Sequence, residues 1–351
     1  MRSRLEIPEY AEDVAAVAAL DLDWGRLAGK TVLVTGATGA IGSFLVDVLI
    51  RRGDIRVVAL GRDREKAMAR LGAHWDTGRF VFVRWDAAAG TVPAADGAVD
   101  YVLHLASNTH PVAYATDPIG TITVNVIALD RLLAFAADHA AARFLFASSN
   151  EIYGENRGDT EFFDESYLGY LDCNTLRGGY PEAKRCGEAL CQAYRRQRAL
   201  DCVIARLTRT YGPTVLEGDT KAASQFFADA LARRDIVLKS EGRQHYSFQY
   251  VADSVAGLLT VLLKGADGEA YNIADPSGDA TLRQLATLLA DAVGRQVRFD
   301  VPEAVEAAGF SRASKARLDG AKLRALGWRP RFTLADGVVR TLGILAAGGR
   351  G

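Results

Sequence analysis

A glycine-rich turn that follows a short apolar segment constrains the fold of this chain more than any other feature. The turn reads Thr35-Gly-Ala-Thr-Gly-Ala-Ile-Gly42 and joins the apolar run Thr31–Thr35 to a segment whose apolar residues recur at helical spacing. Glycines in this arrangement permit a tight strand-to-helix turn, close approach of the backbone to a pyrophosphate, and close packing of the helix on a sheet. The N–H groups at the start of such a helix favour phosphate. The turn therefore predicts a dinucleotide-binding site.

Apolar runs and helical patterns alternate between residues 30 and 207. The strands predicted after the first cover 56–60, 80–85, 101–106, 144–148 and 202–207, and the helices between them include 125–139 and 180–197. Strands that are apolar throughout and separated by helices are typical of a parallel sheet covered on both faces. The predicted fold class is α/β, a doubly wound parallel sheet of the Rossmann type, with a dinucleotide-binding domain at 29–207.

The rhythm changes in the last part of the chain, where short strands and helices follow one another less regularly. Residues 208–351 are predicted to form mainly a smaller α/β substrate-binding domain, with some interleaving between the two domains. Its expected elements are helices at 224–234, 252–264 and 282–293 and strands at 236–238 and 247–251. Residues 1–28 are expected to form a helical extension of no assigned role.

The overall charge argues against partners that are bound by long-range electrostatic attraction. The 351 residues include 42 Lys and Arg against 43 Asp and Glu, a net charge of −1, so no long-range attraction to nucleic acid or to an anionic membrane is expected. No continuous apolar run approaches the ~18 residues of a membrane span. The four cysteines form no C-x-x-C pair, so no metal or redox site is predicted and a reducing cytoplasm is the expected location.

The choice between NAD and NADP depends on the end of the second predicted strand. An acidic residue about 20 residues after the turn would accept a hydrogen bond from the ribose 2′-hydroxyl of NAD. Gly61 and Arg62 stand there instead, and an arginine accommodates the 2′-phosphate of NADP, so NADP is slightly favoured over NAD. Asp63 stays open as a ribose contact, and Asp86, behind the third strand, is a candidate adenine contact.

A tyrosine and a lysine four residues apart form the candidate catalytic pair. Tyr180 and Lys184 share one face of a predicted helix. An ammonium beside a phenol is expected to lower the tyrosine pKa from about 10 toward neutrality. The tyrosine would then remove a hydroxyl proton while hydride leaves the same carbon for a nicotinamide. Ser148 and Ser149 close the fifth predicted strand and offer the hydroxyl group that such a site needs.

With these motifs the sequence resembles the extended short-chain dehydrogenase/reductase family, which acts on nucleotide-diphosphate sugars. The resemblance runs from residue 30 to about 337. Its motifs are T-G-x-x-G-x-x-G at 35–42, Ser149 with Tyr153-Gly154, Tyr180-x-x-x-Lys184, Arg206 before Tyr211-Gly212-Pro213, and Lys322-Leu323 with Leu326-Gly327-Trp328. It implies Ser149, Tyr180 and Lys184 as the catalytic triad, oxidation at sugar C4, and a homodimer formed by the helices near 125–139 and 180–197.

The resemblance also implies a set of ligand contacts. For the cofactor these are Gly36, Thr38, Gly39, Ala40, Ile41, Gly42, Arg62, Asp86, Ala87, Leu105, Ala106, Ser107, Tyr180 and Lys184. The candidate contacts of the nucleotide-sugar substrate are Ser107, Ser149, Asn150, Arg209, Arg243 and Tyr246. Of these, Arg243 is a second candidate beside Arg209 for balancing the diphosphate charge, with a solvated loop arginine as the alternative.

Within the family, Glu151 favours the members that resemble UDP-glucuronate decarboxylases. These enzymes and the 4,6-dehydratases carry a glutamate at this position, and it is usually not acidic in 4-epimerases. A 4-keto group acidifies C5, where a carboxylate can assist proton removal or decarboxylation; Glu151 could also be a structural ion-pair partner. The dehydratases have an aspartic acid where this chain has Asn150. An amide cannot protonate a departing hydroxyl, so Asn150 counts against dehydration.

Two positions depart from the decarboxylase pattern. Tyr246 stands where the decarboxylases have an arginine just before a Ser-Phe pair, and Arg209 stands where the family usually has an asparagine that contacts the diphosphate. We expect Arg209 to balance the diphosphate charge, because a guanidinium binds such groups well. These two departures leave open whether UDP-glucuronate or another nucleotide sugar is the substrate. A nucleotide-sugar 4-epimerase, a 4,6-dehydratase and, outside enzymes, an NADP-binding sensor protein are the alternatives.

Overall fold

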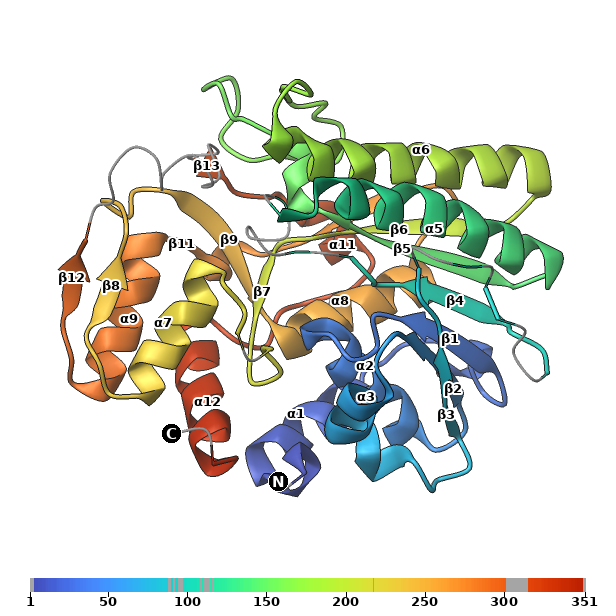
Figure 1. The fold of residues 1–351 in the computed structure, drawn as a ribbon, viewed down its shortest axis with the longest axis horizontal. Helices are drawn as coiled ribbons and strands as arrows, with labels where there is room; N and C mark the ends of the chain where they lie inside the picture. Colours follow the sequence, from blue (N-terminus) through green and yellow to red (C-terminus); the bar gives the residue numbers. More distant parts are fainter. Residues whose placement is uncertain are drawn as a thin grey trace.

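The computed structural model describes residues 3–87, 90, 92–93, 97–107, 109, 114, 116–216, 218–300 and 315–349. Its centre is a sheet of seven parallel strands in the order β10-β6-β5-β4-β1-β2-β3 (Figure 1). The strands are β1 (Thr31–Thr35), β2 (Arg56–Gly61), β3 (Phe80–Arg84), β4 (Tyr101–His104), β5 (Arg143–Ser149), β6 (Cys202–Leu207) and β10 (Ala270–Ile273). The predicted α/β, doubly wound parallel fold class is confirmed.

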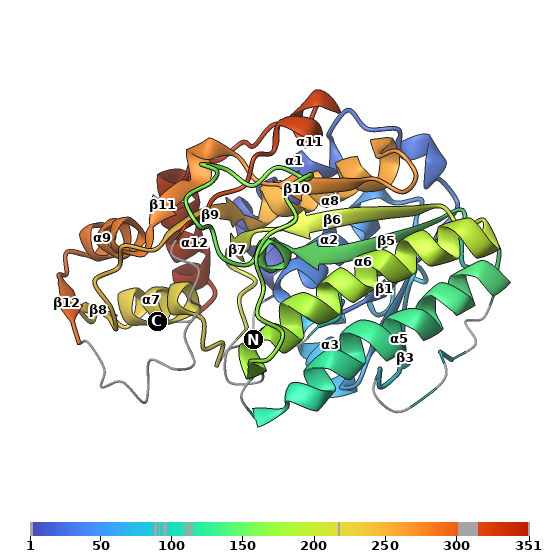
Figure 2. The ribbon, with the colours of Figure 1, turned by 90° about the horizontal axis from the view of Figure 1, so that it is seen from above.

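Helices cover both faces of this sheet. Strand β1 shows why, since Val32 and Val34 contribute to one apolar core and Leu33 to another, as expected when successive side chains point to opposite faces. On one face lie α1 (Pro8–Ala18), α2 (Ala40–Arg52) and α8 (Val251–Lys264), and on the other α5 (Pro118–Asp138) and α6 (Gly179–Arg198), which run side by side (Figure 2). Helix α3 (Arg64–Leu71) connects β2 to β3.

The strand order reverses beside β1. The chain passes from β1 to β2 and β3 on one side, and then to β4, β5 and β6 on the other. In such sheets ligands bind outside the carboxyl ends of the strands at the point of reversal. The fold therefore places a binding crevice between the ends of β1 and β4.

The second part of the molecule packs beside these strand ends (Figure 1). In it, β9 pairs with β7, β11 and β13, and β8 pairs with β12. Its elements are β7 (Arg209–Tyr211), α7 (Ala222–Leu231), β8 (Ile236–Leu238), β9 (His245–Tyr250), β11 (Asp279–Thr281), α9 (Leu282–Val293), β12 (Val297–Phe299), β13 (Lys315–Ala316) and α12 (Leu334–Ala347). Helix α8, β10 and α11 (Ala321–Ala325) return to the large sheet.

Short 3-10 helices complete the described structure. They are η1 (Arg4–Glu6), η2 (Trp24–Arg26), η3 (Gly72–His74), η4 (Asn150–Tyr153), η5 (Leu176–Gly178) and η6 (Pro276–Gly278). Two of them lie at the candidate site. Helix η4 contains Asn150 and Glu151, and η5 ends two residues before Tyr180.

The N-terminal extension contains helix α1, which ties the two parts together. Asp13 on α1 is buried and accepts hydrogen bonds from the Tyr250 hydroxyl at 2.7 Å and from Arg340 Nε at 2.7 Å. On the same helix, the Tyr10 hydroxyl donates to Asp47 of α2 at 2.5 Å. Because α1 contacts α2, α8 and α12, the extension forms part of the folded core.

Helix α5 begins seven residues earlier than the predicted 125–139. Pro118 occupies its first turn and the Asp117 side chain caps it by accepting from Gly120 N, two features that favour a helix start. Within the described part of the chain, α5 is also the one helix long and apolar enough to cross a membrane. Here it packs against α6 and the sheet, and a core helix passes the same test.

Candidate active site

A cavity of about 780 Å³ lies at the carboxyl ends of β1, β2, β4 and β5 and reaches the second part of the molecule. It is large enough for an extended ligand. All of the predicted site residues except Arg243 line it. These are Gly36, Thr38, Gly39, Ala40, Ile41, Gly42, Arg62, Asp86, Ala87, Leu105, Ala106, Ser107, Ser149, Asn150, Glu151, Tyr180, Lys184, Arg209 and Tyr246.

The glycine turn has the geometry that a dinucleotide requires. Gly36 has φ +68°, and a Cβ there would lie 2.8 Å from the backbone N of Ala106. A Cβ on Gly42 would lie 2.2 Å from the carbonyl oxygen of Gly36. Neither position tolerates a side chain, so the turn stays tight and opens the N-terminus of α2 to the cavity. The turn therefore fits the pyrophosphate of a nicotinamide dinucleotide.

The loop after β2 and the first turn of α3 place two positively charged side chains at the cavity. The Asp63 side chain caps α3 by accepting from Lys66 N at 2.9 Å, so its carboxylate is engaged within the helix start. Arg62 and Lys66 both line the cavity. The sequence indicated Arg62 but missed Lys66, which a search of the first turn after the loop would have found.

The candidate triad comes together from β5 and α6. Ser149 ends β5, while Tyr180 and Lys184 lie in the first two turns of α6. Ser149 and Ser107 hydrogen-bond to Tyr180, and Lys184 Nζ donates to the carbonyl oxygen of Ala147 at 2.7 Å. Tyr180 and Lys184 are buried. The predicted meeting of the three side chains is therefore present.

The predicted net lowering of the Tyr180 pKa toward neutrality is wrong for this structure. Burial raises the pKa of Tyr180 above its usual value and Glu151 raises it further, while hydrogen bonds from Ser149 and Ser107 and the charge of Arg177 offset part of the rise. Burial also lowers the pKa of Lys184 to about 7. The reason lies in desolvation, which disfavours the charged forms of both groups.

Glu151 is held by an arginine that the sequence did not assign to the site. Arg177, in η5, donates from Nη2 to Glu151 Oε2, and its guanidinium lies 4.6 Å above the ring of Tyr114. Tyr114 in turn stacks on Tyr180, with ring centroids 5.0 Å apart. Arg177 precedes Tyr180 by three residues, which was the available signal; Tyr114 belongs to no motif.

Two of the predicted substrate contacts lie together and one lies apart. The guanidinium carbon of Arg209 is 3.4 Å from the ring centroid of Tyr246, and both residues line the cavity beside Asn150. Arg243 lies outside the cavity lining, because its side chain is 82% exposed and pairs with Glu241 at 2.8 Å. The predicted role of Arg243 in substrate binding is therefore wrong.

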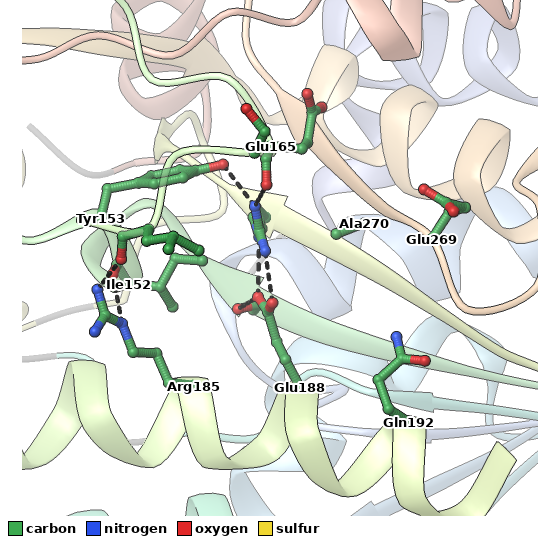
Figure 3. A network of polar contacts seen from close by, with 12 residues as sticks. Ile152, Tyr153, Glu165, Arg185, Glu188, Gln192, Glu269 and Ala270 are labelled. Atoms are coloured by element: carbon green, nitrogen blue, oxygen red, sulfur yellow. Dashed lines mark hydrogen bonds and ion pairs between the residues drawn. The ribbon is translucent and has the colours of Figure 1, made fainter. Parts of the chain in front are cut away.

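A largely buried ion pair between Glu188 and Arg206 attaches the catalytic helix α6 to the sheet. Glu188 on α6 accepts from Arg206 Nη2 at 2.7 Å and from Nε at 3.0 Å, and from the Ser148 hydroxyl at 2.6 Å. Arg206 Nη1 donates to the Tyr153 hydroxyl at 2.9 Å. Figure 3 shows Glu188 and Tyr153 converging on this guanidinium, with Arg185 bonded to Ile152 nearby. The network fixes α6 against the ends of β5 and β6.

The described residues hold no group of three or more His, Cys, Asp and Glu side chains suited to a metal ion. The four cysteines are free thiols.

The parallel sheet, the glycine turn and the Ser149–Tyr180–Lys184 cluster define a nicotinamide-dependent protein of the short-chain dehydrogenase type. The chain belongs to the NAD dependent epimerase/dehydratase family, whose sequence model matches residues 32–274. The resemblance stated from its motifs is thereby confirmed, and the family is NAD-dependent.

Curated relatives of the chain include UDP-glucuronic acid decarboxylases of Arabidopsis thaliana. The chain is 32% identical to decarboxylase 2 over 314 residues, covering 88% of this chain and 67% of the relative. It is 33% identical to decarboxylase 6 over 307 residues, covering 88% and 86%.

Enzymes named for nucleotide-diphosphate sugars are among the solved structures of similar fold. A dTDP-glucose 4,6-dehydratase double mutant from Streptomyces venezuelae, with NAD bound, is 27% identical and has a TM-score of 0.76, covering 90% of this chain and 96% of that chain. A UDP-glucuronic acid 4-epimerase mutant from Bacillus cereus has a TM-score of 0.77 over 90% and 99% of the two chains. At 22% identity, the second likeness concerns the fold alone.

Proposed function

We propose that this protein catalyses a redox-neutral reaction of a nucleotide-diphosphate sugar through a 4-keto intermediate, most simply the decarboxylation of UDP-glucuronate. The observation that carries the proposal is the position of Glu151. Its carboxylate is held by Arg177 beside Ser149 and Tyr180 in one cavity, so C4 and C5 of one sugar ring would each face a group suited to their chemistry. The decarboxylase relatives support the same assignment.

At C4 the reaction needs a group that takes the hydroxyl proton. Tyr180 fills this role, and the Ser149 hydroxyl lies within hydrogen-bonding reach of it. In the proposed complex both hydroxyls bind the C4 oxygen of the sugar. Lys184 lies one turn along the same helix, where its charge favours the phenolate form of Tyr180 when it is protonated. A bound nicotinamide dinucleotide would accept hydride from C4 and carry a positive charge into the cavity.

At C5 the reaction breaks the bond to the carboxylate. The electron pair of that bond moves toward the C4 ketone, where the hydroxyls of Tyr180 and Ser149 stabilise the developing oxyanion by hydrogen bonds. Carbon dioxide leaves, C5 gains a proton, and return of the hydride to C4, with a proton from Tyr180 to the C4 oxygen, would make the whole reaction redox-neutral. Glu151 follows Ser149 by two residues and lines the same cavity. We assign to its carboxyl group the protonation of C5.

A panel of nucleotide sugars analysed by mass tests the proposal. The purified protein is incubated with UDP-glucuronate, UDP-glucose and dTDP-glucose, and each product is weighed and its sugar identified. Loss of carbon dioxide from UDP-glucuronate is the expected result. Loss of water from a neutral sugar would indicate a 4,6-dehydratase, and an isomer of unchanged mass a 4-epimerase. Cofactor binding with no product from any sugar would favour the sensor alternative.

For the cofactor we propose NADP in preference to NAD. Asp63 is engaged as the cap of α3, while Arg62 and Lys66 line the cavity near the end of β2, where a 2′-phosphate would lie. The nucleotide released from the purified, denatured protein identifies the cofactor. Recovery of NADP is expected, and recovery of NAD alone would contradict this preference.

We further propose that the protein is a cytoplasmic homodimer without a nucleic acid or membrane partner. The net charge of −1 gives no bulk attraction to either partner. Three isoleucines of α5 expose apolar side chains, Ile119 by 79%, Ile122 by 43% and Ile127 by 47%. An apolar helix face of this kind suits the predicted dimer formed by α5 and α6.

A further inference from the structure

The stacking of Arg209 on Tyr246 follows from the pairing of two short strands. Strand β7 runs parallel to β9, with Arg209 opposite Phe248. Tyr246 lies two residues before Phe248 and therefore projects from the same face of β9, within reach of a long side chain on β7. Tyr246 is only 3% exposed, so its ring provides a fixed surface. The guanidinium carbon lies 3.4 Å from its centroid, which orients the guanidinium plane.

The charge of Arg209 is available to a ligand. Two other cations of the cavity are engaged within the protein, since Arg177 holds Glu151 and Lys221 holds Asp219 at 2.9 Å. Among the residues that the structure describes, no carboxylate pairs with Arg209. A guanidinium stacked on a ring keeps its edge N–H groups free for an oxyanion, which it binds through two hydrogen bonds.

The position of Arg209 indicates which part of the substrate it meets. Leu207 of β6 pairs in register with Ser149 of β5, and Arg209 follows Leu207 by two residues. The glycine turn, in contrast, follows β1, two strands away from β5 in the sheet. Burial raises the pKa of Tyr114, which stacks on Tyr180, and the charge of Arg209 offsets part of this rise, so Arg209 lies near that ring pair. The guanidinium therefore belongs to the end of the cavity where the sugar reacts.

We infer that Arg209, held by Tyr246, binds the carboxylate of a uronate sugar and so selects substrates that carry this group. The inference rests on the proposed function. It differs from the role expected from the sequence, in which Arg209 balances the diphosphate. Tyr246 acts as a positioning residue, because it reaches the substrate through the orientation that it gives to Arg209.

Binding measurements on the purified protein loaded with the reduced cofactor, which cannot accept hydride and therefore prevents turnover, distinguish the two roles of Arg209. Titration calorimetry compares UDP-glucuronate, UDP-glucose and UDP with the wild type and with Arg209→Gln. We expect the wild type to bind UDP-glucuronate at least ~10-fold more tightly than UDP-glucose, a difference typical of one charged contact. Arg209→Gln should abolish this preference and leave the affinity for UDP-glucose and UDP unchanged. Arg243→Gln, outside the cavity, is the control that should retain the preference.

Other outcomes would overturn the inference. Equal weakening of all three ligands by Arg209→Gln would assign the guanidinium to the diphosphate, and unchanged binding would exclude any contact with an anion of the substrate. If UDP-glucuronate is decarboxylated while Arg209→Gln binds it normally, the inference alone fails. A wild type that binds none of the three ligands contradicts the proposed function as well.

The part played by Tyr246 is tested separately. Tyr246→Phe keeps the ring and is expected to bind UDP-glucuronate like the wild type, whereas Tyr246→Leu should lose the preference as Arg209→Gln does. Thermal unfolding and binding of UDP establish that each variant is folded. A Tyr246→Leu variant that is folded and retains the full preference for UDP-glucuronate would contradict the positioning role.

Discussion

At the scale of single residues, Lys184 shows how burial changes the pKa of a group in the site. Its ammonium donates to the Ala147 carbonyl and has an apolar ring face close by, with Nζ 4.7 Å from the centroid of Phe146. Glu188 and Cys191 raise its pKa, but burial outweighs them and lowers the pKa to about 7. The lysine is therefore poised to change its charge near neutral pH.

Replacement of this lysine should alter the pH dependence of stability. Between about pH 7 and about pH 10.4 the unfolded chain binds a proton at Lys184 that the folded chain has released, so the free energy of unfolding rises with pH. The contribution is up to about 1.4 kcal/mol per pH unit. Lys184→Met lacks this contribution. Urea unfolding across this range should show the variant losing stability relative to the wild type as pH rises, and a constant difference would contradict the assigned burial effect.

The residues that the sequence could predict are those with a chemical pattern of their own. Ser149, Tyr180 and Lys184 follow from strand ends and helix spacing, and they meet in the cavity as expected. Arg177 and Tyr114 were not assigned to the site because their roles depend on contacts across the fold, one with Glu151 and the other with the ring of Tyr180. The raised pKa of Tyr180 likewise depends on burial, which spacing alone does not reveal.

At the scale of elements, the buried pair of Arg206 and Glu188 fastens the catalytic helix α6 to strand β6. Their side chains are 11% and 14% exposed, and Glu188 also accepts from Ser148, next to the catalytic serine. Removal of one partner leaves a charge buried without compensation, which costs more than the pair itself contributes. The network thus couples the position of the triad to the stability of the domain.

Two arginine variants measure this coupling. Arg206→Met should lower the free energy of unfolding by about 3–5 kcal/mol, the usual cost of breaking a buried pair. Arg195→Met breaks the exposed pair with Asp267, whose side chains are 45% and 39% exposed, and should cost less than about 1 kcal/mol. Chemical denaturation gives both values. Similar losses for the two variants would show that burial does not govern the strength of these pairs.

The sequence predicted most elements within a few residues and missed some for physical reasons. The bounds of β6, β8 and α9 agree with the prediction. The start of α5 was missed because β-branched residues and a glycine follow Pro118, a composition that lowers helix propensity. Strand β10 was missed because its place at the sheet edge is determined by pairing with β6, a contact distant in sequence that local pattern does not reveal.

At the scale of the whole molecule, a net charge near zero coexists with a local cluster of positively charged side chains. The net charge is −1, yet Arg62, Lys66, Arg177 and Arg209 line one cavity together with Lys184. The proposed ligands are a cofactor pyrophosphate and a sugar diphosphate, both anionic, and the N-terminus of α2 adds a further favourable end. Recognition is therefore local and does not need an overall positive charge.

Assembly is the other property of the whole molecule that can be tested. Ile122→Lys places a charge on the exposed apolar face of α5 and is expected to convert the proposed dimer to a monomer. Val339→Lys is the matched control, because Val339 is 64% exposed on α12, away from α5, and should leave the dimer intact. Light scattering measures both masses. A wild type that is already monomeric would contradict the proposed assembly.

The most direct test of the central claim is the release of carbon dioxide from UDP-glucuronate labelled at its carboxyl carbon. The wild-type protein should release the label and form the decarboxylated nucleotide sugar. Glu151→Gln should form that C5-protonated product at least ~100-fold more slowly, as expected for the loss of a general acid–base group, while it still oxidises C4, visible as reduced-nicotinamide absorbance. If the wild type releases no label, decarboxylation is contradicted, and if Glu151→Gln forms the product at the wild-type rate, the role of Glu151 at C5 is contradicted.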